Sequence, residues 1–478
     1  MSVTLKIINN FSSSVKSGSD YFGHHYSDEQ VWLFFLNTSG KITYTLDGTT
    51  TTKTVTDASS FQLSTVKDGK LTLSTGENST KLFAGLGAEN PFKGVNGPGI
   101  FDKDVPYALA EWTINGNEYD NLDISYIDSF SFPTVATVKN AENVETRKST
   151  FNAGTTASDV ILKLEGCMPK GPVGPDSAQK PTSGQVGFGP GIPAVSGDTT
   201  AKRWVGSSKF WISAPDTNHN RGMYIYAPKL NSYLKYLQDH EPITKVGTNS
   251  IKGWYIDYSG NGGYSGYLSI TGTSATGYGL EIHDIRVNTS PSAANNWEAQ
   301  PSAGDVTTGK ITVAANNASV VFPAVPTDKV SGLWTDAVIY SGAALLGTIG
   351  GGPIIIGTDD FKTSGTHASI VATFLASISA SVTTGLLGST MYVDAYTSKD
   401  TPKSTMYWFN TLTRAESTTK LFDKAWPKGE QFFDPFWATL AEATGNQGYL
   451  SPFNDRWSNF SPDLALGTDY TIEWELGL

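Results

Sequence analysis

The sequence predicts a mainly β protein with an additional α+β part. Up to about residue 165, the chain is a succession of short β-patterned runs separated by Gly, Asn, Asp and Ser turns. After about residue 205, runs with helical periodicity alternate with β-patterned runs. The 49 glycines, together with abundant Ser and Thr, agree with many turns and short strands. We therefore expect a β-barrel or β-sandwich joined to a mixed α/β domain.

The first domain is predicted to span residues 1–203. It begins with a strand, because Val3, Leu5 and Ile7 alternate with other residues. Six further strands are predicted at VWLFFL (31–36), KITYTL (41–46), KLTLS (70–74), TKLFAGLG (80–87), AEWTI (110–114) and ISYIDSFSF (124–132). Short strands at this density favour a sandwich or a closed barrel.

A Pro/Gly-rich segment without periodicity, residues 171–197, is expected to be a long loop or a crossing between domains. The second, α+β domain is predicted to span residues 204–446. The C-terminal run at 470–478 is β-patterned. We expect it to return to the first domain, which residues 447–478 would complete.

Within the second domain, helices are predicted over 230–240, 368–382 and 434–445, and a hairpin over 253–273. The helix at 434–445 has Asp434 as its N-cap, Pro435 at its first position and Gly445 after its end. The apolar run at 368–388 keeps a polar face, so an amphipathic helix is favoured over a membrane span.

Composition restricts the classes of partner. The net charge of −11 argues against nucleic acid and against an anionic membrane. Only 17% of residues are charged, whereas 12% are aromatic, including twelve Trp. A charge-poor, aromatic-rich surface suits neutral sugars, whose C–H faces stack on rings.

Several chemistries are excluded by the motifs that the sequence lacks. The single Cys167 excludes an intramolecular disulfide and a Cys-based zinc site. There is no phosphate-binding loop, serine-hydrolase elbow, HExxH zinc motif or EF-hand loop. Neither a cofactor nor a metal is therefore predicted. The N-terminal residues form a strand pattern, so no secretory signal is expected within this chain.

Two carboxylates occupy strand positions in the stretch EWTINGNEYDNLDISYIDSFSFP (111–133). Acids are disfavoured in strands, which makes Glu111 and Asp128 the unusual members of this stretch. Glu118, Asp120 and Asp123 fall in the predicted connection, where acids are ordinary. Asp128 shares its face with aromatic residues, a costly position for an acid unless it is paired or lines a wet cleft.

The register of the two strands decides whether Glu111 and Asp128 meet. A turn around Tyr119 and Asp120 would place them opposite each other, whereas a tight turn at 115–116 would place Glu111 opposite Asp120. Directly opposite carboxylates would lie about 5 Å apart, as in a retaining glycosidase. A splayed pair would reach the roughly 6.5–9.5 Å of an inverting one.

The motif A-E-W-T at 110–113, followed by S-Y-I-D-S-F-S-F-P at 125–133, resembles glycoside hydrolase family 64, the β-1,3-glucanases with a thaumatin-like fold. Two further runs are similar to that family, MYIYAPKLNSYLKYLQD (223–239) and QGYLSPFNDRWSNFSP (447–462). The chain differs from the family pattern by one extra residue between the two acids and by Ser129 in place of an aromatic residue.

The resemblance implies an inverting, endo-acting hydrolase of β-1,3-glucan with a wide groove between its two domains. It places the general acid at Glu111 and the general base at Asp128. Substrate-binding residues are expected at five positions, Thr113, Asn115, Tyr126, Asp455 and Arg456. For Asp455 and Arg456, an ordinary ion pair is the alternative interpretation.

Two other functions remain open from the sequence. One is a non-catalytic glucan-binding protein, and the other is a toxin-like interaction protein on the same fold. The presence of both acids favours the enzyme. We expect a monomer whose partner is the polysaccharide itself, and an extracellular location because the substrate is found there.

Overall fold

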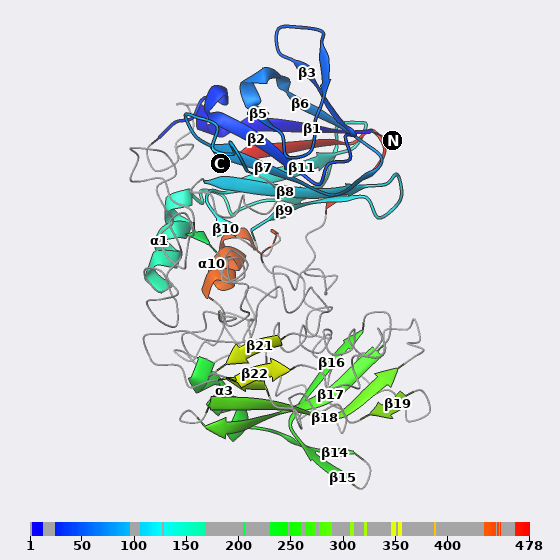
Figure 1. The fold of residues 1–478 in the computed structure, drawn as a ribbon, viewed down its shortest axis with the longest axis vertical. Helices are drawn as coiled ribbons and strands as arrows, with labels where there is room; N and C mark the ends of the chain where they lie inside the picture. The colour runs from blue at the N-terminus through cyan, green and yellow to red at the C-terminus, as the bar shows by residue number, and fades with distance from the viewer. Residues whose placement is uncertain are drawn as a thin grey trace.

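The protein is described by a computed structural model. The residues that it describes are 2–12, 24–95, 106–126, 129–167, 204–205, 230–246, 249–259, 263–273, 277–288, 306–309, 320–322, 346–349, 352–355, 387–388, 435–445, 447–448, 450 and 464–478. Within them the fold is mainly β, as the sequence predicts, with its two largest sheets near the N-terminus (Figure 1).

A seven-stranded sheet contains both ends of the described chain. Its strands, in spatial order, are β12 (Glu145–Ser149), β11 (Thr134–Lys139), β24 (Thr471–Leu476), β1 (Ser2–Asn9), β6 (Val66–Ser74), β3 (Ile42–Leu46) and β4 (Thr52–Thr54). Strand β24 pairs with β1 in parallel and with β11 antiparallel. The predicted return of the C-terminal strand to the first domain is therefore confirmed, and Figure 1 shows it in red beside the blue β1.

A six-stranded sheet packs against the seven-stranded sheet. Its strands, in spatial order, are β23 (Leu464–Ala465), β9 (Asn121–Ser125), β8 (Tyr107–Ile114), β7 (Glu77–Leu86), β2 (Val31–Leu36) and β5 (Ser60–Gln62). Short 3₁₀ turns adjoin these strands at η1 (Asn10–Ser12), η2 (Asp28–Gln30) and η3 (Leu63–Thr65). The two sheets form the sandwich that the density of short strands predicts.

The core of the sandwich consists of the inward faces of the two sheets. Val3, Leu5 and Ile7 are buried as their alternation predicts, and Trp112 and Trp474 are fully enclosed. Burying one such side chain stabilises the fold by about 1.5–3 kcal/mol. Residues next to these in the strands, such as Lys6 and Glu111, point the opposite way and therefore lie on the outward faces of the sheets.

The remaining described elements include a second group of strands. A further sheet contains β16 (Trp254–Ser259), β17 (Gly263–Thr273), β18 (Gly277–Asn288) and β19 (Val306–Gly309), with β20 (Val320–Phe322) also paired to β18. Three two-stranded pairs are β10 (Ser129–Phe130) with β13 (Trp204–Val205), β14 (Ile243–Val246) with β15 (Asn249–Lys252), and β21 (Leu346–Ile349) with β22 (Gly352–Ile355). The hairpin predicted over 253–273 is confirmed by the antiparallel pairing of β16 and β17.

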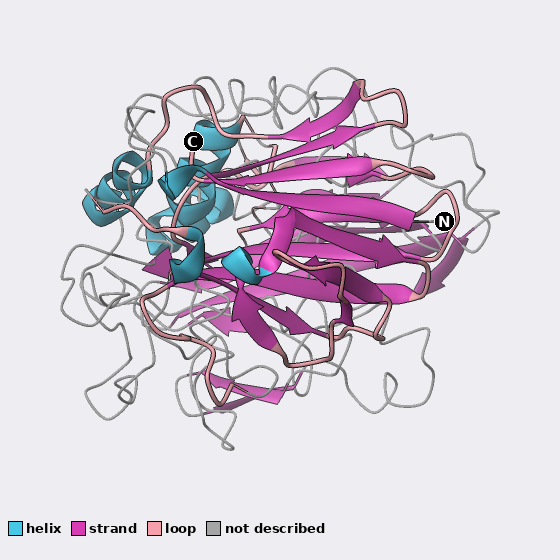
Figure 2. Cartoon of the chain, turned by 90° about the horizontal axis from the view of Figure 1, so that it is seen from above, coloured by secondary structure: helices cyan, strands magenta, loops and turns pink. Residues whose placement is uncertain are grey.

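Three described α-helices accompany the strands, and Figure 2 shows the helical ribbon gathered toward one side of them. They are α1 (Ala157–Cys167), α3 (Leu230–Asp239) and α10 (Pro435–Thr444). Helix α3 confirms the helix predicted at 230–240, and Leu237 on it accepts a hydrogen bond from Trp254 Nε1 at 2.9 Å. Helix α10 confirms the helix predicted at 434–445, with Gly445 at φ +59° after its end. Asp434, the helix predicted over 368–382 and the segment 171–197 lie outside the described residues.

Helix α1 was not predicted, because the sequence up to residue 165 was interpreted as strands. Its signal is a capping box, in which Asp159 N–H donates to Thr156 Oγ1 at 3.1 Å and Thr156 N–H donates to Asp159 Oδ2 at 3.0 Å. The helix packs against α10, and Lys163 pairs with Glu442 at 3.3 Å. Helix α10 therefore contacts the first predicted domain, while the domain boundaries at 203 and 446 stay predictions.

The strand predicted over 124–132 is wrong as a single element. Strand β9 ends at Ser125, and Ser129–Phe130 pair with β13 instead. Side chains also hold the chain on either side of this break. Tyr126 Oη lies 2.6 Å from Thr134 Oγ1, and Ser131 Oγ accepts a hydrogen bond from Tyr107 N–H at 3.1 Å.

Candidate functional site

Glu111 lies on the outward face of β8, in the middle of the six-stranded sheet. The strand forms because YALAEWTI alternates inward and outward positions, with Trp112 and Ile114 completely buried. Glu111 and Thr113 project from the other face, and the Glu111 side chain is 25% exposed. This strand therefore presents a half-buried carboxylate to the outside of the sandwich.

Strand β9 places Asp123 opposite Glu111. The paired residues run from Leu109 with Ser125 to Thr113 with Asn121. Both registers considered from the sequence are therefore wrong, since neither Asp128 nor Asp120 is the cross-strand partner of Glu111. Asp123 was interpreted as an ordinary connection residue, and the structure corrects this because it lies inside a strand.

The register follows from the side chain of Asp120. This residue is 1% exposed, and its two carboxylate oxygens accept hydrogen bonds from Asn115 N–H at 2.7 Å and Gly116 N–H at 2.8 Å. Gly116 has φ +82°, which glycine adopts readily. Asp120 therefore closes the connection around Asn117 and fixes which residues of β9 face β8. It too is not an ordinary connection residue.

Lys81 on β7 completes a row of three charged residues. It is the cross-strand partner of Glu111 on the side away from Asp123, and its ammonium forms a salt bridge with Glu111 Oε2. The Lys81 side chain is 28% exposed, so water reaches the pair but does not surround it. One oxygen of Asp123, Oδ1, is excluded from solvent. We call Lys81, Glu111 and Asp123 the acidic row.

An apolar cluster borders the acidic row along the same face. The next positions on the same face of the sheet are Phe83 on β7, Leu109 on β8 and Phe34 on β2. All three side chains are buried. Phe92 covers them and stacks on Phe34 at a ring separation of 5.1 Å. Apolar neighbours lower the local dielectric, which strengthens the electrostatic interactions within the row.

Thr113 and Asn115, two of the predicted substrate-binding residues, lie near Glu111. Thr113 is half-buried on the same face, and its hydroxyl accepts a hydrogen bond from Ser79 N–H at 3.1 Å. Asn115 is exposed, and its side chain donates to Asn78 Oδ1 at 2.8 Å. Both positions are accessible from the outside of the sheet.

Tyr126 does not occupy an open position. Its side chain is 2% exposed, and it packs edge-on against Phe151 at a ring separation of 5.3 Å. Burial raises the pKa of its hydroxyl far above the usual range. Tyr126 was predicted to line a substrate groove. The structure corrects this prediction, because the side chain is enclosed within the fold. Asp128, Asp455 and Arg456 lie outside the described residues.

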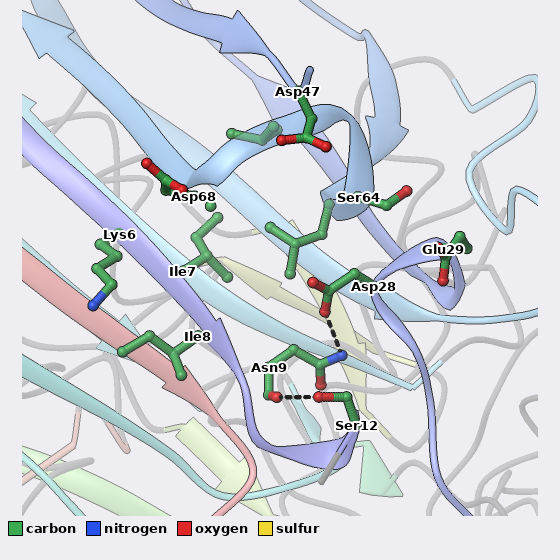
Figure 3. A pocket seen from close by; sticks show the side chains of 13 residues that line it. Lys6, Ile7, Ile8, Asn9, Ser12, Asp28, Glu29, Asp47, Ser64 and Asp68 are labelled. Atoms are coloured by element: carbon green, nitrogen blue, oxygen red, sulfur yellow. Dashed lines mark hydrogen bonds between the residues drawn. The ribbon is translucent and has the colours of Figure 1, made fainter.

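A hollow of about 510 Å³ lies elsewhere, beside β1 (Figure 3). Its lining includes Lys6, Asn9, Asp28, Asp47 and Asp68, and Asn9 Nδ2 donates to Asp28 Oδ1 at 2.9 Å. None of the predicted site residues lines it. Within the described part of the chain, no group of three or more His, Cys, Asp or Glu side chains is arranged to hold a metal ion. Nor does any described helix combine the length and apolar character needed to cross a bilayer.

Two residues of the acidic row were missed from the sequence. Lys81 interrupts an apolar strand, and a basic residue in a strand next to an acid-bearing strand is the signal that was available. Asp123 gave no comparable signal, because its place depends on the register that Asp120 sets.

The fold is similar to that of a β-1,3-glucanase domain of glycoside hydrolase family 64 from Clostridium beijerinckii. The TM-score is 0.47 at 14% sequence identity, covering 100% of this chain and 98% of that chain. A laminaripentaose-producing β-1,3-glucanase of the same family, from Paenibacillus barengoltzii, was compared in two structures. The complex with laminarihexaose gives a TM-score of 0.23 at 13% identity, and the other structure gives 0.24 at 16%.

Each Paenibacillus comparison covers 35% of this chain and 44% of that one. No protein-family model matches the sequence, and no curated protein matches it. These likenesses lie below the level at which a structural match argues for a function. The residues of the site therefore carry the proposal that follows.

Proposed function

We propose that the protein is a glycoside hydrolase that cleaves β-1,3-glucan within the chain, with Glu111 as its general acid. The observation that carries the proposal is the position of Glu111, a half-buried carboxylate on the outward face of a central strand. It stands in the A-E-W-T motif that resembles family 64. The charge-poor, aromatic-rich composition agrees with a neutral polysaccharide substrate.

The proposed chemistry needs two carboxylates with different protonation states. Protonated Glu111 gives its proton to the glycosidic oxygen as the bond from that oxygen to the anomeric carbon breaks. Asp128, assigned by the motif alone, takes a proton from the water that attacks the anomeric carbon from the opposite face. This gives inversion at the anomeric carbon.

The surroundings of Glu111 are suited to binding a sugar. Thr113 and Asn115 lie on the open side of the strand, where hydroxyl and amide groups bond sugar hydroxyls. We propose that these two residues bind the glucan, together with Asp455 and Arg456. We further propose that the protein works as a monomer, outside the cell and without a cofactor.

One observation favours a second candidate, a glucan-binding protein without catalysis. Lys81 forms a salt bridge with Glu111 in this structure, and a general acid has to leave such a partner before it can donate to the substrate. A protein that never releases Glu111 from Lys81 would bind glucan but not cleave it. A toxin-like interaction protein on this fold, in contrast, would neither bind nor cleave glucan.

The release of new reducing ends from soluble β-1,3-glucan tests the enzyme directly. We expect the native protein to release them and the Glu111→Gln variant to release at least about a hundredfold fewer. Equal release by both proteins would exclude Glu111 as the acid, and no release by the native protein would exclude hydrolysis. Sedimentation with insoluble β-1,3-glucan then separates a binding protein from one that ignores the polymer.

A further inference from the structure

Strand β7 has one extra residue opposite Thr113 of β8. The regular cross-strand pairs on either side of this point are Glu77 with Ile114 and Thr80 with Trp112. Between these pairs, β7 contributes two residues, Asn78 and Ser79, where β8 contributes only Thr113. Two residues opposite one define a β-bulge, and bulges are frequent next to active sites, where they redirect side chains. We call Asn78 and Ser79 the β7 bulge.

The β7 bulge bonds two of the proposed glucan-binding residues. Ser79 N–H donates to Thr113 Oγ1 at 3.1 Å, and Asn115 Nδ2 donates to Asn78 Oδ1 at 2.8 Å. These bonds use neither the O–H of Thr113 nor the amide oxygen of Asn115. Thr113 therefore keeps a donor and Asn115 keeps an acceptor, the two kinds of group that bond sugar hydroxyls.

Burial of the neighbouring residues does not require the extra residue. Glu77 and Thr80 both face the core and are completely buried, although they are three positions apart. With a single residue between them, both would face the core by the ordinary alternation of a strand. The bulge therefore adds a residue that the packing of β7 could omit, and its effect is felt on the exposed side of the strand.

The conformation of the β7 bulge is held by the chain that follows β2. Ser79 has φ +46°, in the left-handed region that residues other than glycine rarely adopt. Asn37 Nδ2 donates to the carbonyl of Ser79 at 3.4 Å, and Thr80 Oγ1 donates to the carbonyl of Asn37 at 3.3 Å. Such backbone conformations persist where the surroundings fix them, and they gather at ligand sites.

The buried carboxylate of Glu77 anchors one end of the bulge. It accepts hydrogen bonds from groups of Thr38, Ser39, Lys41 and Thr80. Losing any of these bonds inside the protein is costly, because a buried polar group without its partner is strongly destabilised. The bulge is thus attached to a rigid part of the sandwich.

We infer that the β7 bulge is a positioning device, in which Asn78 holds Asn115 and Ser79 holds Thr113 in the orientation that binds β-1,3-glucan. This inference rests on the proposed function, because Thr113 and Asn115 are the residues proposed to bind the glucan beside Glu111. Asn78 and Ser79 act through their partners and need no contact with the sugar. Because the two side chains are ordered before the substrate arrives, binding loses less conformational entropy.

The kinetics of soluble β-1,3-glucan hydrolysis test the role of Asn78. Asn78→Ala removes the partner of Asn115 and is expected to raise KM about fivefold with kcat little changed. Asn78→Asp keeps an acceptor oxygen at the same place and therefore keeps the native KM. Adding Asn78→Ala to Asn115→Ala raises KM no further, since Asn78 acts through Asn115. A further rise in that double variant, or a native KM in folded Asn78→Ala, would overturn the inference.

Deletion of Ser79 tests the bulge as a whole. It leaves one residue between Glu77 and Thr80, so the alternation of β7 is kept while the extra residue is lost. KM is expected to rise about twentyfold, because Thr113 and Asn115 are both displaced. The matched control deletes Thr146, the extra residue of a bulge between β11 and β12 on the other sheet, and leaves KM unchanged. Thermal denaturation establishes that both deletions fold, and a native KM in the folded Ser79 deletion would contradict the inference.

A second readout does not depend on hydrolysis. In ¹⁵N-labelled protein, the side-chain amide of Asn115 is identified by its loss in Asn115→Ala. Its heteronuclear NOE is expected to fall to the value of a mobile amide in Asn78→Ala and to stay native in Asn78→Asp. This change in a protein that neither hydrolyses nor binds glucan would refute the proposed function and keep the positioning of Asn115. Hydrolysis without the change would keep the proposed function and refute the inference.

Discussion

The outward faces of the two sheets each carry a row of lysine and carboxylate side chains, and the rows differ in the number of described lysines that bond the central carboxylate. On the seven-stranded sheet, Glu473 lies between two lysines, with Lys139 Nζ at 2.6 Å from one carboxylate oxygen and Lys6 Nζ at 3.4 Å from the other. On the six-stranded sheet, Lys81 forms a salt bridge with Glu111 through Oε2, and Asp123 lies opposite Glu111 on the next strand.

This difference separates a carboxylate bonded at both oxygens, Glu473, from one with a described salt bridge at a single oxygen, Glu111. Hydrogen bonding from Lys139, followed by the charges of Lys139 and Lys6, lowers the pKa of Glu473 below its usual value. Glu473 is thereby fixed as an ion and has little chemistry left to do. Glu111, in contrast, is bonded by one described lysine at Oε2, and its side chain is 25% exposed.

Exchanging the central carboxylates gives the sharpest test of this comparison. Glu111→Gln is expected to lower the hydrolysis of soluble β-1,3-glucan about a thousandfold, equivalent to about 4 kcal/mol of barrier, because the proposed general acid is lost. The matched variant Glu473→Gln should hydrolyse at the native rate. If the two variants lose activity equally, the rows do not differ in function. Reducing-end assays at saturating substrate measure both.

The register that creates the acidic row depends on Asp120. Replacing it with Ala is expected to lower the free energy of unfolding by about 2 kcal/mol, because two part-buried hydrogen bonds from backbone N–H groups to a carboxylate are lost. Asp120→Asn, which keeps one acceptor oxygen, should lose about half as much. Urea denaturation measures the change, and the exposed Glu118→Gln serves as the control. An Ala variant as stable as the native protein would show that Asp120 does not hold the connection.

Tyr126 anchors the chain directly after β9. Its hydroxyl bonds the side chain and the backbone N–H of Thr134, at 2.6 and 3.2 Å. Tyr126→Phe leaves these groups without their partner and is expected to cost about 1–2 kcal/mol of unfolding free energy. Tyr119→Phe, at a side chain that is 75% exposed, should change stability by less than about 0.5 kcal/mol. Thermal denaturation compares the two, and equal midpoints would assign no stabilising role to the Tyr126 hydroxyl.

The row on the seven-stranded sheet should contribute a small, pH-dependent stability. Because the pKa of Glu473 is lowered by folding, its contribution is present above the carboxyl pKa of the unfolded chain. It is lost as the pH falls through the lower pKa of the folded state. Glu473→Gln is expected to cost about 0.5–1 kcal/mol at pH 7 and nothing below pH 2. Urea denaturation at the two pH values checks this, and a loss that persists in acid would argue against the ion pairs as its cause.

Much of the sandwich follows from local patterns. The alternation in β1, β8 and β24 places Leu5, Trp112 and Trp474 inside, because a strand directs successive side chains to opposite faces. The same alternation puts Glu111 on the outside, so its placement could be predicted without knowing its neighbours. Helices α3 and α10 were predicted for a similar reason, from apolar positions at helical spacing and from Pro435 and Gly445 at the ends of α10.

What could not be predicted depends on contacts between distant segments. Asp120 sets the register through hydrogen bonds across a six-residue connection, and its own carbonyl accepts a bond from Leu466 N–H at 2.9 Å. That partner comes from the far end of the chain. Lys81 meets Glu111 only because β7 and β8 pair, although 30 residues separate them in sequence. The sequence therefore predicts the outward position of Glu111, but it does not predict the two charged neighbours of that residue.

The sequence by itself determined the class of fold, the return of the C-terminal strand and the exposure of Glu111. The class of fold and the exposure of Glu111 follow from the two-residue period of a strand and the burial of apolar side chains. The return of the C-terminal strand was an expectation that its pairing with β1 confirmed. Only the tertiary structure decided that Asp123 faces Glu111 and that Lys81 bonds it. A change of register by one residue reverses the face that every side chain of a strand occupies, and no local pattern records which register the distant contacts select.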